Sequence, residues 1–187
     1  MFSDTDFKKA IESAKTQLRA VETALSMLAS PEITCHSIHL RDLTHDTIEE
    51  LLEEVPTGYT KKDKETDFVY VIQVNGGNRK AIDNLRTALE QARKTANDYS
   101  RVNQEHDDTN TIYVGRSKTI RARLRQHLGA ENQGVFSLHL QRWATQIDME
   151  ISICQMSFSN ADDLLVQAVE DGIWGFLKPA FGRKGER

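Results

Sequence analysis

The sequence contains little cysteine and no long hydrophobic run, and each absence excludes a class of protein. Its two cysteines, Cys35 and Cys154, lie far apart among 187 residues and have no paired spacing. We therefore expect two buried thiols in a reducing cytoplasm, not a disulfide or a zinc site. No apolar stretch approaches the roughly 18 residues that cross a bilayer, so no membrane partner is predicted.

Targeting signals and familiar DNA-reading modules are also missing. The N-terminal residues 1–6 are acidic and lack the basic-then-apolar order of a secretory signal, which predicts a cytoplasmic protein. The chain has no low-complexity tract, zinc finger or helix-turn-helix pattern. At this length we expect one well-packed core with a helical addition.

The charge balance argues against a protein that coats nucleic acid nonspecifically, because the net charge is -4. Basic residues are nevertheless concentrated between positions 116 and 125, with no acid among them, whereas residues 44–55 are strongly acidic. A confined basic patch on an acidic protein indicates a local contact with an anion. The alternative is a solvated helix face.

Two segments repeat apolar residues in alternating steps of four and three, which predicts amphipathic helices with a narrow apolar seam. The first runs from Phe7 to Leu28 and ends before Ser30-Pro31; the second covers residues 79–99. Such seams pack against other helices. The two helices could pair within one subunit or across a homodimer, and the sequence pattern does not distinguish these two arrangements.

Strand signals are strongest at Phe68–Val74, which is rich in aromatic and β-branched residues. Residues 111–113 and 149–158 give weaker signals, and residues 33–40 are a candidate for a further short strand. These signals predict an α+β fold, with a small, mainly antiparallel three-stranded sheet flanked by helices.

The expected organisation has two parts, an N-terminal helical region at residues 1–66 and a domain at residues 67–187 that carries an inserted helix at 79–99. A polar segment, residues 58–67, reads as the linker between them.

The most informative stretch begins at Tyr113 and ends at His127. A strand runs into Gly115, and a basic helix follows directly, with Arg123 and His127 four residues apart on one helix face. Arginine can bind a phosphate oxygen, while a phenol or an imidazole can handle the proton of an attacking water. The pattern is therefore typical of a site for phosphodiester chemistry.

Residues 67–184 resemble the GIY-YIG nuclease family. The second half-motif is Tyr113-Val114-Gly115, and the first is present in degenerate form as Phe68-Val69-Tyr70. The family's arginine and histidine fall on Arg123 and His127, and its glutamate, with a proline nine residues later, falls on Glu170 and Pro179.

The chain departs from the family pattern at two places. Gly182 occupies the position where the family often has asparagine, three residues after the proline. About 40 residues separate the two half-motifs, which a hairpin tolerates because the cost of loop closure grows only logarithmically with length. Insertions of this kind occur in the restriction-enzyme branch of the family.

The resemblance implies a metal-dependent endonuclease that cleaves DNA. Tyr70 and Tyr113 would lie on neighbouring strands and act on the attacking water, with the phenol pKa lowered by a nearby cation. Arg123 would bind the scissile phosphate, and His127 would contact the phosphate or assist proton transfer. Glu170 would bind one divalent cation, Mg²⁺ or Mn²⁺.

Four further basic residues are candidates for contact with the DNA backbone, where they add affinity without reading sequence. They are Arg116, Lys118, Arg121 and Arg125.

Two other functions remain open. Because the first half-motif is degenerate and the asparagine is replaced, the chain could be a catalytically weak DNA-binding or repair accessory module. Because two heptad seams are present, it could be mainly a helical assembly protein. Within the nuclease interpretation, restriction, repair and mobile-element roles all stay possible.

Overall fold

The computed structural model describes residues 3–58, 66–76, 79–96, 98–104, 109–129 and 135–185. The helices are α1 (Asp4–Met27), α2 (His45–Glu53), α3 (Arg79–Ala92), α4 (Ile120–Leu128), α5 (Leu140–Trp143) and α6 (Asp163–Leu177), with a short 3-10 turn at Leu40–Asp42. The strands are β1 (Ile33–His39), β2 (Thr66–Val74), β3 (Thr111–Ser117) and β4 (Glu150–Ser159). Most of the predicted linker, residues 59–65, lies outside the described residues.

The α+β class is confirmed, but the predicted number of three strands is wrong. The described residues form a four-stranded antiparallel sheet in the order β1-β4-β2-β3. The additional strand, β1, comes from the region predicted as helical and pairs with β4 along its whole length. Its short, mixed sequence has only a weak strand propensity. Pairing with the longer strand β4 stabilises the extended conformation that the local sequence alone does not favour.

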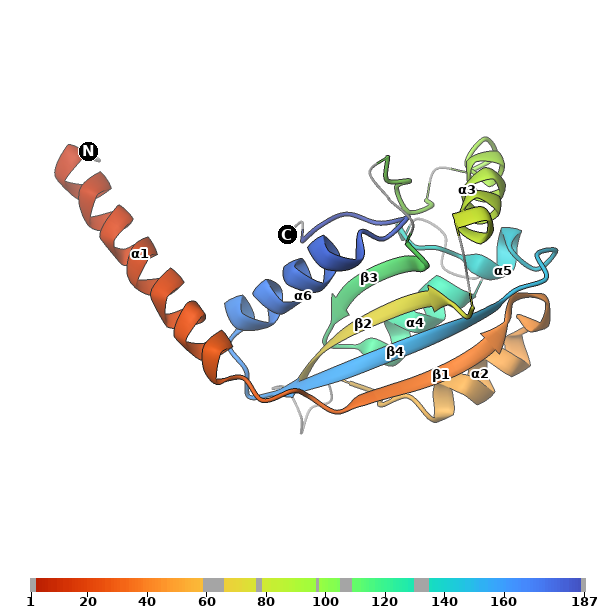
Figure 1. The fold of residues 1–187 in the computed structure, drawn as a ribbon, viewed down its shortest axis with the longest axis horizontal. Coiled ribbons are helices and arrows are strands. Elements are labelled where there is room, and N and C mark those ends of the chain that lie inside the picture. Colours follow the sequence, from red (N-terminus) through yellow and green to blue (C-terminus); the bar gives the residue numbers. More distant parts are fainter. Residues whose placement is uncertain are drawn as a thin grey trace.

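Strand alternation divides the core into two layers (Figure 1). Residues Val69 and Val71 of β2 pack with Val166 of α6 on one face. Phe68, Tyr70 and Ile72 point to the other face and pack among residues of α2, α3, α4 and α5. Because β3 is an edge strand of the sheet, a site beside it can draw side chains from both layers.

The two heptad helices do not pair with each other in the subunit. Helix α1 begins with a side-chain cap, since the Ser3 side chain accepts a hydrogen bond from the backbone N–H of Asp6. It projects from the rest of the molecule, and α3 lies at the opposite end (Figure 1). Leu18 in the α1 seam is 70 % exposed, whereas Leu85 and Leu89 in the α3 seam are fully buried.

The prediction of two free, buried thiols is wrong. Cys35 of β1 and Cys154 of β4 are direct register partners and form a disulfide. Cys35 is exposed and Cys154 is half-buried. Their distance in the sequence hid the pairing, because only the β1–β4 register brings the two positions together.

No helix in the described part of the chain is long and apolar enough to cross a membrane.

Candidate functional site

A pocket of about 1150 Å³ lies beside β3, between α6 and α4. Four of the five predicted catalytic residues line it although they are distant in the sequence: Tyr70, Tyr113, Arg123 and Glu170. The pocket thus gathers two phenols, a guanidinium and a carboxylate into one cavity, from β2, β3, α4 and α6.

The fifth residue, His127, lies behind the pocket wall. It is fully buried, and its Nε2 lies 2.9 Å from the hydroxyl of Tyr70. The backbone N–H of Leu138 donates to Nδ1 at 3.3 Å, which assigns the ring proton of the neutral imidazole to Nε2. Nε2 therefore donates to the Tyr70 oxygen, and the hydroxyl proton of Tyr70 is left to donate to another acceptor.

The protonation states follow from burial. Burial raises the pKa of Tyr70 well above its usual value, and the nearby Arg123 does not offset this effect. The prediction that a cation lowers this pKa is therefore wrong for the protein alone. Burial likewise lowers the pKa of His127 far below its usual value, so the imidazole is neutral at physiological pH.

Two glycines allow the rings of Tyr70 and Tyr113 to pack closely against the backbone. The rings of Tyr70 and Tyr113 are stacked with centroids 6.0 Å apart. A Cβ atom on Gly115 would lie 2.6 Å from the Tyr70 hydroxyl. Gly182 has φ +96°, and a Cβ there would lie 2.7 Å from the Tyr113 ring. The glycine at the position of the family's asparagine is therefore required by its contact with Tyr113.

Arg123 is held at the pocket wall by three acceptors. Its guanidinium donates to Gln126 at 2.8 Å and to the carbonyl of Phe136 at 3.2 Å. It also reaches the hydroxyl of Tyr113 at 3.5 Å. These contacts orient the guanidinium beside the phenols, where a phosphate oxygen could replace the weakest of them.

Glu170 is the carboxylate best placed to hold a cation. Only 8 % of the residue is exposed, and its carboxyl accepts a hydrogen bond from Gln167 at 3.2 Å. Burial, with a contribution from the neighbouring Asp171, raises its pKa to about 7. A buried carboxyl with a raised pKa, facing a pocket that can admit water, fits a divalent cation because the ion would restore the charged form.

The cation would depend on water and substrate for its other ligands. Among the described residues, no group of three histidine, cysteine or acidic side chains could enclose a metal ion. The nearby Asp67 does not serve, because one of its oxygens pairs with Arg116 and the other accepts the backbone N–H of Phe68.

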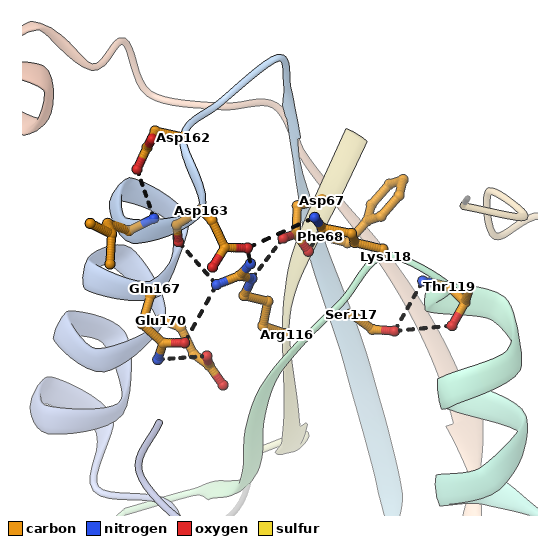
Figure 2. A network of polar contacts seen from close by, with 11 residues as sticks. Asp67, Phe68, Arg116, Ser117, Lys118, Thr119, Asp162, Asp163, Gln167 and Glu170 are labelled. Atoms are coloured by element: carbon orange, nitrogen blue, oxygen red, sulfur yellow. Dashed lines mark hydrogen bonds and ion pairs between the residues drawn. The ribbon is translucent and has the colours of Figure 1, made fainter. Parts of the chain in front are cut away.

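Figure 2 shows the network around Arg116, which sequence reasoning missed. The guanidinium pairs with Asp67 at 2.7 Å, forms an ion pair with Asp163 and contacts Gln167 at 3.4 Å. Arg116 therefore joins β2, β3 and the first turns of α6. The one available signal was a charged residue, Asp67, at the start of an otherwise apolar strand.

The remaining candidates for DNA contact have different surroundings. Lys118 lines the pocket and is half exposed. Arg121 donates to the carbonyl of Val55 at 2.9 Å, and Arg125 pairs with Glu49 at 2.5 Å. Arg125 therefore holds α4 against α2, and Arg121 holds α4 against the residues that follow α2. Contact of all four residues with DNA stays a prediction.

No protein-family model, no curated protein and no solved structure matches this chain. The relation to the GIY-YIG nucleases therefore stays a prediction, supported by the sequence motifs and by the arrangement of the residues that those motifs identify.

Proposed function

We propose that this protein is a metal-dependent endonuclease that hydrolyses DNA phosphodiester bonds. The observation that carries the proposal is the convergence of Tyr70, Tyr113, Arg123 and Glu170 on one pocket, from four separate elements. Phenols, a guanidinium and a buried carboxylate around one cavity provide the groups that in-line attack of water on a phosphate requires.

In this mechanism each side chain has a distinct task. Arg123 binds a non-bridging oxygen of the phosphate and stabilises the charge that develops during attack. Tyr70 begins as a protonated phenol whose oxygen is fixed by His127, so it orients the attacking water. The proton that this water loses passes through solvent to the leaving oxygen, which departs as a hydroxyl group. Tyr113 stacks on Tyr70 and contacts Arg123, so its ring and hydroxyl would restrict the position of that water.

His127 is a positioning residue, because its ring bonds the Tyr70 hydroxyl and packs 4.4 Å from the Tyr113 ring between centroids, while its lowered pKa keeps it neutral. Glu170 would hold Mg²⁺ or Mn²⁺, which would neutralise phosphate charge and stabilise the leaving oxygen.

Nicking of a supercoiled plasmid in Mg²⁺ tests the proposal. We expect Glu170→Gln to be slower by about 100-fold or more, because the metal supplies several kcal/mol of transition-state stabilisation. Glu90→Gln is the matched control, since Glu90 is exposed on α3 and does not line the pocket. Equal nicking by the wild type and Glu170→Gln would refute the enzymatic proposal.

A DNA-binding or repair accessory module is the second candidate. The buried, protonated state of Tyr70 favours it, because such a phenol is a poor base unless ligands change its surroundings. This candidate predicts binding of DNA without Mg²⁺-dependent nicking by the wild type. The nicking assay therefore separates the two. Mapping the cut positions would then distinguish a restriction-type enzyme from a repair nuclease.

A further inference from the structure

One end of the pocket is built by three segments that lie outside the sheet. Residues 98–103, 135–139 and 180–182 are joined by backbone hydrogen bonds, and two isolated bridges link Tyr99 with Ser137 and Val102 with Phe181. Ser100 N–H donates to the carbonyl of Ser137 at 2.8 Å. The N–H of Gly182 donates to the carbonyl of Arg101 at 2.9 Å. The backbone here is therefore a fixed frame.

This frame presents an aromatic ring and a cluster of cations to the pocket, which we call the arginine end. It consists of Arg93, Arg101, Phe136 and Arg183. Arg93 directly follows α3, Arg101 belongs to the frame and Arg183 lies in the segment after α6; all three are exposed. The acidic residues in the described lining, Asp67, Asp163 and Glu170, lie around Arg116 and on α6.

Phe136 is the unusual member of this group. It is 67 % exposed although it lines a concave pocket. Its own backbone carbonyl accepts a hydrogen bond from Arg123 at 3.2 Å, so residue 136 is anchored to the guanidinium proposed to bind the scissile phosphate. An exposed ring on a fixed backbone, with arginines nearby, is the combination that single-stranded nucleic acid requires: a surface for base stacking and charges for the phosphates.

We propose that the arginine end binds an unpaired nucleotide adjacent to the scissile phosphate, with its base stacked on Phe136 and its backbone phosphate bound by Arg93 and Arg101. Within a duplex the flat faces of the bases are covered by their neighbours, so a ring at the pocket wall can stack only on an unpaired base. The preferred substrate is therefore DNA with a single-stranded tail or gap. The position of the cut rests on the proposed function, but the binding preference does not.

Fluorescence anisotropy in EDTA measures this preference without cleavage. The probes are a labelled single strand, the blunt duplex of the same sequence and a duplex with a single-stranded tail. We expect the wild type to bind the single strand and the tailed duplex at least tenfold more tightly than the blunt duplex. Phe136→Ala should weaken binding of those two probes by about 5- to 100-fold, and Phe136→Trp should restore it.

Phe176→Ala is the matched control, because this phenylalanine is 86 % exposed on α6 and does not line the pocket. Arg101→Ala should weaken binding of all probes and lower the salt dependence by about one ion. Equal affinity of the wild type for single-stranded and blunt DNA, or a Phe136→Ala variant indistinguishable from Phe176→Ala, would overturn the proposal.

The two proposals can fail separately. A protein that nicks DNA in Mg²⁺ but shows no effect of Phe136→Ala would refute only the unpaired-nucleotide site. A protein that binds single strands through Phe136 but never cleaves would refute only the nuclease.

Discussion

At the scale of single residues, burial decides the chemistry more strongly than neighbouring charge. Tyr70 lies near a cationic Arg123, yet its pKa is raised because its phenol is fully enclosed. A phenolate would form only when ligands bring further positive charge into the pocket. The buried tyrosine is thus set to donate a hydrogen bond first, and its hydroxyl is held in place by His127.

The raised pKa of Glu170 gives a pH-dependent stability. Its pKa rises from 4.5 to about 7 on folding, so the native state holds the proton more tightly than the unfolded state. The free energy of unfolding should therefore fall as pH rises from about 5 to 8. Glu170→Gln should match the wild type near pH 4 and exceed its stability by about 3 kcal/mol at pH 8. Urea denaturation across this pH range measures the difference.

Magnesium supplies the complementary check on Glu170. At pH 8, added Mg²⁺ should stabilise the wild type and leave Glu170→Gln unchanged, since a ligand that binds only the native state raises its stability. Parallel pH profiles for the two proteins, with no response to Mg²⁺ in either, would contradict the role assigned to this carboxyl.

The spacing of Tyr113, Arg123 and His127 was readable from the sequence because one strand, one turn and one helix fix it locally. The positions of Asp67 and Phe136 were not readable. Asp67 meets Arg116 only through the pairing of β2 with β3, and Phe136 reaches the pocket only through backbone bonds of the loop that holds it. Contacts between residues that are distant in the chain leave no recognisable pattern in the local sequence.

At the scale of elements, the Arg116 network is the tie between α6 and the sheet edge. The Arg116→Ala variant leaves the buried carboxylate of Asp67 without its ion-pair partner, so we expect a loss of about 3 kcal/mol in the free energy of unfolding. Lys118→Ala should change it by less than about 0.5 kcal/mol because Lys118 is half exposed. Urea titrations of the two variants make the comparison.

This comparison also tests the predicted contact of Arg116 with DNA. A pure phosphate contact would weaken DNA binding and lower its salt dependence without any change in stability. Such a result for Arg116→Ala would contradict the structural role given to the network.

The disulfide should make β1 dependent on redox conditions. Because it closes a separation of 119 residues in the chain, Cys35→Ser should cost about 2–4 kcal/mol of unfolding free energy under oxidising conditions. In excess reductant the variant and the wild type should become equal. Hydrogen exchange should report the loss in the slowest-exchanging amides of the sheet, which exchange only through global unfolding. Mass spectrometry that finds two free thiols in the oxidised wild type would contradict this account.

Heptad periodicity located two apolar helix faces but could not say what covers them, and the predicted end of the second helix at residue 99 is wrong because α3 ends at Ala92 and Tyr99 bridges to Ser137. The same pattern leaves Leu18 exposed in α1 and buries Leu89 completely in α3. A heptad repeat identifies which face of a helix is apolar. Which element packs against that face depends on the path of the rest of the chain. The start of α1 was predictable for the opposite reason, since the Ser3 cap is a local contact.

At the scale of the whole molecule, the projecting α1 is the feature that points to assembly (Figure 1). Its seam exposes several large apolar side chains, namely Phe7, Ile11, Leu18 and Leu25. We propose that a second copy of the chain covers this seam and forms a homodimer. Light scattering should give the mass of a dimer for the wild type and of a monomer for Leu18→Asp, with unchanged helicity.

Two variants control this prediction. Ser13→Asp lies on α1 outside the seam and should remain dimeric. Leu89→Asp places a charge in the core and should unfold the protein, so it cannot report on assembly. The same mass for Leu18→Asp and the wild type would contradict the proposed dimer.

Single-turnover cleavage of labelled DNA at pH 8 in Mg²⁺ tests the central claim most directly, because it joins the pocket to the reaction. Tyr70→Phe keeps the ring in the core and removes only the hydroxyl, so we expect it to cleave about 100- to 10,000-fold more slowly than the wild type while binding DNA equally well. Cleavage at the wild-type rate by Tyr70→Phe and by Glu170→Gln would contradict the account.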